Sequence, residues 1–438
     1  MATVAIAGAG LSGMAAAAAL SAAGCRVVLL ESRPYTGGRA ASYTAPGSEE
    51  IIDNCQHILL RCCVNLLDFY RRIGVENLID FHREFHYLEP GGRRSVFRAG
   101  LLPAPAHFAG SFAALRFLSF SEKLEAVRAL AALRRERTRR NDLDRITMQQ
   151  WLEEKRQSPR TVRRFWAPVL VSAVNEDLDR MAASHGFQIF HLAFLAARDA
   201  YHMGVPRVPL GDLCSAERIS GLPGVEIRLR TKVTGVRLEG GRVEALETDA
   251  GPVEADAFLS ALPFDPLRRL LPGLLDDWTP FEHSPIAAIH LWFDRPVTAL
   301  PHAVLLDSPF QWFFSKQQGR YIQLVVSAAR FLERWPRQVA VARALEDLAR
   351  YLPAVPAAGL ARSHVVKEVR ATFSARPGLA GKRPLAETRY ANLFLAGDWT
   401  QTGWPSTMEG AVRSGYRAAE AACRLLGKER AFVLPDVG

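Results

Sequence analysis

The chain has 438 residues, of which 49% are hydrophobic and 23% charged, and its formal net charge is +10 at pH 7. This composition is typical of a globular protein, and the length exceeds a single ordinary core, so we expect two domains. The sequence shows neither an export signal nor an apolar run of transmembrane length, which predicts a cytoplasmic protein. Because most of the positive excess is scattered arginine, we expect no nucleic-acid partner.

The first apolar segment, residues 4–7, predicts a buried strand that leads into a glycine-rich turn and an alanine-rich helix. Glycines at the first, third and sixth positions of such a turn permit the tight turn, the approach of phosphates and close packing of helix on strand. The helix start offers free N–H groups and positive dipole charge. We therefore predict that a pyrophosphate binds at Gly8, Gly10, Leu11, Ser12 and Gly13.

A second apolar run, residues 26–30, ends at Glu31, roughly 20 residues beyond the turn, where a dinucleotide fold places an acid for the ribose. A carboxylate accepts both ribose hydroxyls and repels a 2′-phosphate, so FAD or NAD is favoured over NADP. The chain then continues through Ser32 to a glycine pair ending at Gly38, followed by Arg39. The backbone of the glycine pair, which has no side chains, and the Arg39 guanidinium can both bind phosphate oxygens. This combination favours FAD over NAD.

The region 83–202 is predicted to be largely helical, and its part from 100 to 140 is apolar at first and ends in a cluster of arginines. Such a segment fits a helix lying in a membrane interface, which would place the protein at the inner face of a membrane. It fits equally well an internal helix with a solvated basic end.

Short alternating strands are predicted between 221 and 262, and aromatic-rich strands between 288 and 326. They indicate a discontinuous FAD-binding domain, residues 1–82, 203–275 and 374–438, interrupted by a substrate-binding domain, residues 83–202 and 276–373. The predicted fold is α/β, with a Rossmann-type FAD-binding domain and a mixed helical and β-sheet substrate domain. The aromatics Phe165, Trp166, Phe187, Phe190 and Phe194 suit an apolar wall of that domain, although core packing is the usual role of such residues.

Near the C-terminus, a buried strand at 392–396 is followed by Gly397 and Asp398, and a last helix follows Thr407. Together with the two N-terminal motifs, this segment resembles the FAD-dependent amine oxidoreductase superfamily, which includes the phytoene desaturases. The resemblance implies that an acid binds the ribityl chain, that a helix start meets the flavin, and that a strand passes the adenine. It assigns these contacts to Gly397, Asp398, Thr407, Met408, Ala411 and Val233.

The six cysteines show no metal-ligand spacing, so we expect no metal, and none lies between 397 and 415, so we expect noncovalent FAD. Only one dinucleotide unit is visible in the sequence. Flavin reduction is therefore expected to depend on an external electron donor, either a nicotinamide or a redox protein.

The residues Asp53, Asn54, Gln56 and His57 resemble the squalene-associated branch of this superfamily, the hydroxysqualene dehydroxylases of hopanoid biosynthesis. The chain departs from that pattern at Cys55 and Arg61, where glycine is usual. The resemblance implies an apolar isoprenoid substrate and reductive removal of a hydroxyl, with hydride from reduced flavin. Carotenoid desaturation, amine oxidation and a non-enzymatic prenyl-binding escort role remain as alternatives.

Removal of an allylic hydroxyl requires a proton donor and surroundings that tolerate a cation. Asp53 and His57 are the nearest candidates for proton delivery, although a structural role is equally compatible with each. Trp399 and Trp404 could flank a cation with their ring faces. Glu409 is a further candidate acid, or it complements the helix dipole.

Overall fold

The computed structural model describes residues 1–437. Its cofactor-binding part is built on a five-stranded parallel sheet in the order β10-β2-β1-β14-β20. The strands are β1 (Thr3–Ala7), β2 (Arg26–Leu30), β10 (Val225–Arg228), β14 (Ala257–Ser260) and β20 (Leu393–Leu395). Strands from both ends of the chain thus belong to one sheet, and the α/β fold class predicted from the sequence is confirmed.

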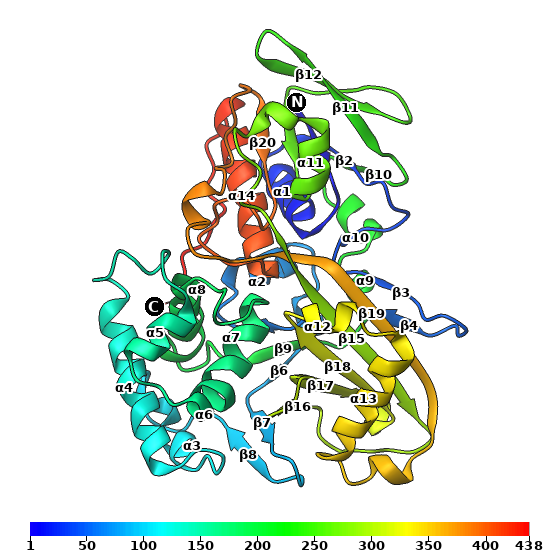
Figure 1. Cartoon of the computed structure of the whole chain (residues 1–438). Helices are drawn as coiled ribbons and strands as arrows, with labels where there is room; N and C mark the ends of the chain where they lie inside the picture. Colours follow the sequence, from blue (N-terminus) through cyan, green and yellow to red (C-terminus); the bar gives the residue numbers. More distant parts are fainter. Residues whose placement is uncertain (438) are drawn as a thin grey trace.

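Helices α1 (Leu11–Ala22) and α14 (Met408–Leu425) pack against each other beside this sheet (Figure 1). Nearly every residue of α1 is buried, because its run of alanines is small enough for close packing on several sides. Gly415 lies at the contact, where a Cβ atom would overlap the carbonyl oxygen of Ser12. Shorter helices adjoin this part: α2 (Val64–Arg72), α9 (Leu210–Leu213), α10 (Ala216–Ser220) and α11 (Phe264–Leu270).

Three small antiparallel sheets complete the surroundings of the parallel sheet. The first contains β11 (Val233–Glu239), β12 (Arg242–Thr248) and β13 (Val253–Glu254). The second pairs β3 (Ser42–Thr44) with β4 (Ile51–Asp53), and the third contains β5 (Leu59–Leu60), β9 (Met203–Pro206) and β6 (Ile79–His82).

A seven-stranded sheet forms the second large layer, in the order β19-β15-β18-β17-β16-β7-β8. Its strands are β7 (Phe85–Leu88), β8 (Arg94–Phe97), β15 (His283–Phe293), β16 (His302–Leu305), β17 (Trp312–Lys316), β18 (Tyr321–Ser327) and β19 (Leu360–Phe373). The pair β7 and β16 is parallel and joins two segments more than 200 residues apart. Helices α12 (Arg330–Glu333) and α13 (Arg337–Ala349) adjoin this sheet (Figure 1).

A lobe of helices stands beside the seven-stranded sheet, at the lower left of Figure 1. It contains α3 (Ala109–Ala113), α4 (Phe120–Glu136), α5 (Met148–Glu154), α6 (Pro159–Thr161), α7 (Ala167–Val174) and α8 (Ala183–Phe190). Trp166 and Phe187 are fully buried in the core of this lobe. Within residues 1–437, no helix is both long enough and apolar enough to cross a membrane.

Candidate active site

A continuous cavity of about 890 Å³ extends between the parallel sheet and the seven-stranded sheet. Most of the site residues predicted from the sequence line it, although they come from both ends of the chain. They are Gly8, Gly10, Leu11, Ser12, Glu31, Ser32, Gly38, Arg39, His57, Val233, Gly397, Asp398, Thr407, Met408 and Ala411. Gly13 and Asp53 do not line it.

The glycine-rich turn has the geometry that a pyrophosphate needs. Gly8 has a φ of +102°, which other residues rarely adopt, and a Cβ at Gly13 would overlap the Gly8 carbonyl oxygen. Gly13 therefore acts beneath the turn, by allowing α1 to approach β1. Within the described part of the chain no side chain caps the start of α1 at Gly10, so its first N–H groups are free for an anion.

The glycine pair Gly37 and Gly38 lies next to the glycine-rich turn that contains Gly10. Gly37 pairs with Gly10 in a β-bridge, and a Cβ at Gly38 would lie only 3.1 Å from the Gly10 Cα. Nearby, the carboxylate of Glu31 accepts hydrogen bonds from the Ala9 N–H (3.0 Å) and the Arg33 N–H (2.9 Å). These bonds hold an acceptor at the end of β2, as recognition of a ribose requires.

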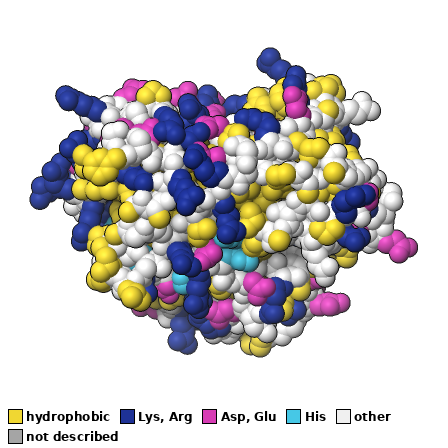
Figure 2. Space-filling model, turned by 90° about the horizontal axis from the view of Figure 1, so that it is seen from below, with side chains coloured by type: hydrophobic (Ala, Val, Ile, Leu, Met, Phe, Trp, Pro, Cys, Tyr) yellow, Lys and Arg dark blue, Asp and Glu magenta, His cyan; other side chains and the backbone are white. Residues whose placement is uncertain are grey.

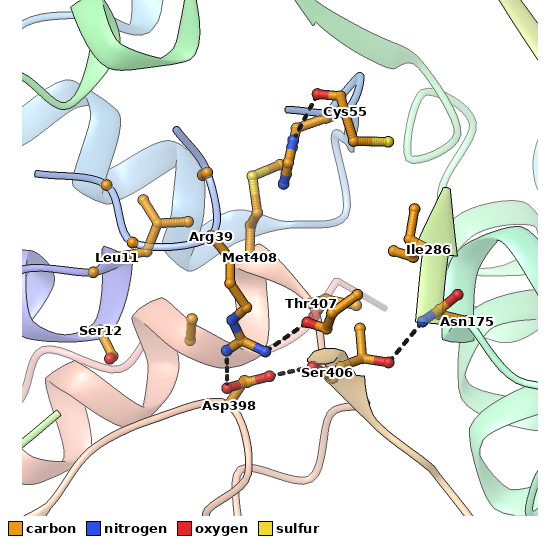
Figure 3. Close-up of a pocket in the computed structure, with 18 of the residues that line it drawn as sticks. Leu11, Ser12, Arg39, Cys55, Asn175, Ile286, Asp398, Ser406, Thr407 and Met408 are labelled. Atoms are coloured by element: carbon orange, nitrogen blue, oxygen red, sulfur yellow. Dashed lines mark hydrogen bonds and ion pairs between the residues drawn. The ribbon is translucent and has the colours of Figure 1, made fainter. Parts of the chain in front are cut away.

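Arg39 and Asp398 form an ion pair at the base of the cavity, 2.5 Å apart, and Ser406 donates to the other carboxylate oxygen (Figure 3). Arg39 also donates to the Ala371 carbonyl over 2.7 Å. Burial alone raises the pKa of Asp398, but the Arg39 charge and these hydrogen bonds outweigh burial and hold the pKa below its ordinary value. The carboxylate is therefore ionised at neutral pH.

Arg383, which the sequence analysis did not identify, organises the loop that follows Gly397. Its buried guanidinium donates to the carbonyl oxygens of Asp398 (2.7 Å) and Trp404 (2.8 Å) and to Thr402 Oγ1 (3.0 Å). Burial lowers its pKa to about 10, so it stays protonated at neutral pH. No motif surrounds Arg383 in the sequence, so only its position in the fold reveals this role.

The start of α14 faces the cavity and is held by side chains. Thr407 Oγ1 accepts the Gly410 N–H over 3.0 Å and caps the helix. The Glu409 carboxylate is fully buried and accepts from the Leu66 N–H (2.8 Å) and from Arg413 Nε (3.0 Å). Burial raises the pKa of Glu409, and its contacts tie α14 to α2.

The structure places the two predicted proton donors differently. The Asp53 carboxylate accepts from the Leu210 N–H (2.9 Å) and Ser42 Oγ (2.7 Å), so it points away from the cavity and binds β4 to its neighbours. Asp53 thus does not line the cavity where proton delivery was predicted, and its other carboxylate oxygen lies 3.5 Å from Lys316 Nζ. His57 lines the cavity, with Nδ1 3.0 Å from the Cys55 carbonyl oxygen. Burial lowers its pKa, so the imidazole is neutral at pH 7 and Nε2 is an acceptor.

The part of the cavity beyond the cofactor residues has mostly apolar walls. Its aromatic lining consists of Phe85, Tyr87, Phe194, Trp312, Phe314, Trp399 and Trp404. Of the five aromatics predicted for the wall, Phe194 alone lines the cavity, whereas the other four pack inside the helical lobe. In Figure 3, Asn175 and Ile286 lie on the side opposite Leu11 and Ser12.

Two polar contacts interrupt the apolar wall. Trp312 Nε1 donates to Ser172 Oγ over 2.9 Å, which brings β17 and α7 together. Asn175 Nδ2 donates to Thr372 Oγ1 over 2.7 Å, beside the Ala371 carbonyl that Arg39 contacts. Ser172, Asn175, Trp312 and Thr372 all line the cavity.

Comparison with known proteins finds relatives that match nearly the whole chain. Hydroxysqualene dehydroxylase from Rhodopseudomonas palustris is 29% identical over 95% of this chain and 97% of that protein. A probable zeta-carotene desaturase from Synechococcus elongatus is 28% identical over 95% of this chain and 98% of that protein.

Solved structures share the fold at lower identity. A putrescine oxidase variant with redesigned cofactor binding gives a TM-score of 0.73 at 16% identity, covering 97% of this chain and 99% of that chain. A putative protoporphyrinogen oxidase from Exiguobacterium gives 0.68 at 19% identity, covering 97% and 99%.

The profile of the flavin containing amine oxidoreductases matches residues 11–423. The site agrees with FAD as the cofactor. The uncapped start of α1 suits the pyrophosphate, the Glu31 carboxylate suits the ribose, and the Arg39–Asp398 pair lies in the same cavity. The chain therefore belongs to the flavin containing amine oxidoreductase family and is an FAD-dependent oxidoreductase.

Proposed function

We propose that this enzyme removes the hydroxyl group of hydroxysqualene reductively and releases squalene. The observation that carries the proposal is the hydroxyl group of Ser172, which lies between the mostly apolar walls of the cavity beside Trp312 and Phe314. Ser172 Oγ accepts a hydrogen bond from Trp312 Nε1, so its own hydrogen is available for donation. Among residues 1–437 no other group accepts that hydrogen, and Ser172 lines the cavity. An apolar substrate that carries one hydroxyl oxygen would satisfy it.

The reaction takes up one hydride and one proton and releases water. When bound, FAD supplies the hydride from N5 of its reduced form. Ser172 would hold the leaving oxygen by donating to it, and Trp312 and Phe314 would place aromatic faces along the carbon that becomes electron-poor. His57 is neutral, so the proton would reach the oxygen from solvent or from a minor protonated form of His57.

The cavity walls support binding of a long hydrocarbon, and the single dinucleotide-binding sheet supports dependence on an external electron donor. The apolar walls come from β7, β17 and the helical lobe and continue into the cofactor cradle without a partition. The parallel sheet forms a single dinucleotide cradle, so electrons would enter from a freely diffusing nicotinamide or a redox protein. Two of the similar proteins, from Rhodopseudomonas palustris and Zymomonas mobilis, are named hydroxysqualene dehydroxylases.

Carotene desaturation is the second candidate, because proteins named carotene or phytoene desaturases are similar to the chain to the same degree. The apolar cavity would also accept a polyene. A carotene, however, has no oxygen to accept the Ser172 hydrogen, and leaving a polar group unpaired against hydrocarbon costs about 1–3 kcal/mol.

Product analysis separates the two reactions. The photoreduced holoenzyme is incubated anaerobically with hydroxysqualene, and the oxidised holoenzyme with phytoene or zeta-carotene. We expect squalene from the first mixture and unchanged carotene in the second. Desaturated carotene without squalene would overturn the proposal.

The role of Ser172 is tested by Ser172→Ala, with Ser327→Ala as the matched control because Ser327 also lines the cavity. We expect Ser172→Ala to slow single-turnover formation of squalene about tenfold or more, as loss of a hydrogen bond of about 1.5 kcal/mol implies. Flavin content should not change, and the control should retain the rate. Equal rates in both variants would remove Ser172 from the reaction.

A further inference from the structure

The outer surface of the helical lobe carries large apolar side chains that remain exposed in the structure of residues 1–437. Leu101 is 94% exposed and Leu102 53%, both in the loop after β8, while Phe120 at the start of α4 is 84% exposed. Leu124 and Val127 follow on α4 at 41% and 49%. Large exposed apolar groups of this kind mark contact surfaces when they occur together. We name these five residues the apolar patch.

The residues of the patch on α4 follow helical spacing. Phe120, Leu124 and Val127 are separated by four and three residues, so they lie on one face of the helix. The opposite face of α4 is buried and includes Ala126, Ala129 and Leu133. The helix therefore has two apolar faces, one toward the core and one toward solvent.

The loop that carries Leu101 and Leu102 is firmly anchored at its base. The Gly100 N–H donates to the His107 carbonyl over 2.6 Å, and Phe108 stacks on Phe97 with ring centroids 4.3 Å apart. Helix α3 connects this loop to α4, because Ser111 Oγ donates to the Arg98 carbonyl and Lys123 Nζ to the Ala113 carbonyl. The loop and the helix thus present their apolar side chains from one connected structure.

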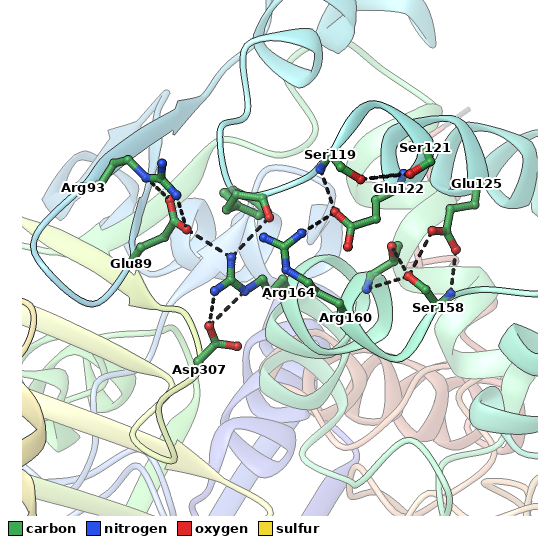
Figure 4. A network of polar contacts seen from close by, with 12 residues as sticks. Glu89, Arg93, Ser119, Ser121, Glu122, Glu125, Ser158, Arg160, Arg164 and Asp307 are labelled. Carbon is green, nitrogen blue, oxygen red and sulfur yellow. Dashed lines mark hydrogen bonds and ion pairs between the residues drawn. The ribbon is translucent and has the colours of Figure 1, made fainter.

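Positive charge surrounds the patch, because the acids of α4 are engaged inward. Glu122 accepts from Arg160 (2.6 Å), Glu125 from the Ser158 N–H (2.6 Å), as Figure 4 shows, and Glu136 from Lys155 (2.7 Å). Exposed arginines without a carboxylate partner among residues 1–437 remain on the outside: Arg116, Arg128, Arg134, Arg137 and Arg139. Figure 2 shows hydrophobic side chains bordered by Lys and Arg on the side where α3 and α4 lie in Figure 1.

We propose that the apolar patch and its arginines dock the enzyme on an anionic lipid bilayer. Projecting Leu and Phe side chains enter the boundary between headgroups and acyl chains, and the arginines pair with the lipid phosphates. A second copy of the chain does not fit this surface as well, because it would bring the same uncompensated arginines together. Docking through this surface does not depend on whether the substrate is hydroxysqualene or a carotene.

Vesicle sedimentation of the FAD-loaded enzyme tests the proposal. Vesicles of phosphatidylcholine with about one-third phosphatidylglycerol are compared with pure phosphatidylcholine, at low salt and at 0.5 M salt. We expect sedimentation with the anionic vesicles and a marked loss at high salt, because screening weakens attraction by the surface charge. Absence of binding to anionic vesicles at low salt would overturn the proposal.

Surface variants assign the binding to the patch. We expect the double variant Leu101→Ser/Phe120→Ser to bind at least tenfold more weakly, and Arg134→Gln/Arg137→Gln to lose about fivefold for each arginine. The matched controls Leu385→Ser and Arg268→Gln change exposed residues elsewhere and should bind as the parent does. Flavin content and thermal unfolding confirm folding of each variant.

Two further outcomes would overturn the assignment. Undiminished vesicle binding in both patch variants would place the membrane contact on another surface. Self-association of the parent enzyme in sedimentation velocity, lost in Leu101→Ser/Phe120→Ser without any vesicle binding, would make the patch an interface between copies.

Discussion

Arg383 is predicted to be essential for both stability and FAD retention. Arg383→Met keeps an unbranched side chain of similar length but removes the donors that bind Asp398, Trp404 and Thr402. Each hydrogen bond from the charged guanidinium contributes about 1.5–3 kcal/mol. Relief of the desolvation of the guanidinium offsets part of this cost, so we expect a net loss of about 3–5 kcal/mol.

The loss would be concentrated where the loop meets the cofactor. This loop carries Asp398, whose carboxylate pairs with Arg39, and it leads to Thr407 at the start of α14. We therefore expect the variant to be purified with less than half of the FAD content of the parent protein. Flavin absorbance per protein and urea unfolding, each measured with and without added FAD, separate a weakened cofactor site from general instability.

The matched control is Arg268→Met, which changes an exposed arginine on α11. We expect this control to unfold within about 0.5 kcal/mol of the parent, as surface substitutions do. A change of less than about 1 kcal/mol in Arg383→Met, together with full FAD content, would refute the assignment of Arg383 as the organiser of the loop.

Two further predictions concern pH and helix packing. Burial, and next the charge of Arg383, lower the pKa of His185 to about 3, so the unfolded chain binds a proton below about pH 6.5 that the folded chain does not. The free energy of unfolding should fall by about 1.4 kcal/mol per pH unit below that value. In His185→Gln, the difference in urea stability between pH 7.5 and 5 should shrink by about 2 kcal/mol, and an unchanged difference would contradict the burial of a neutral imidazole. Gly415→Ala places a Cβ against the Ser12 carbonyl, so α14 must move from α1 at a cost of about 1–3 kcal/mol, with weaker FAD binding. Gly381→Ala is the control, because nothing lies within 4 Å of its Cβ position, and equal melting temperatures for the two variants would argue against the tight helix contact.

The gathering of the predicted cofactor residues around one cavity could be predicted from the sequence, because each motif determines its own geometry locally. The turn from Gly8 to Gly13 and the acid Glu31 belong to one strand–turn–helix–strand unit within about 30 residues. Asp398 lies 359 residues from Arg39, yet both follow strands or turns at one edge of a parallel sheet. The carboxyl ends of parallel strands converge there, so the family resemblance was sufficient to place both residues.

The direction of the Asp53 side chain could not be predicted from the neighbouring sequence. It ends β4, a strand of three residues, and side chains of successive strand residues point to opposite faces. A pattern of three residues is too short to determine which face is toward the cavity. The prediction placed Asp53 and His57 together, whereas the structure directs Asp53 toward Leu210 and only His57 toward the cavity.

Ser172 was overlooked for a different reason, although the sequence contained a signal. It is the polar residue of α7, whose other seven residues are apolar, and a hydroxyl in such a helix requires a partner or a function. Its partner Trp312 is 140 residues away on β17, so neither residue is informative without the other. The same holds for Arg383 and the carbonyl groups it binds. A polar residue within an apolar segment can thus be identified from the sequence as a residue that needs a partner. Which partner it contacts depends on the distant segments that the fold brings together.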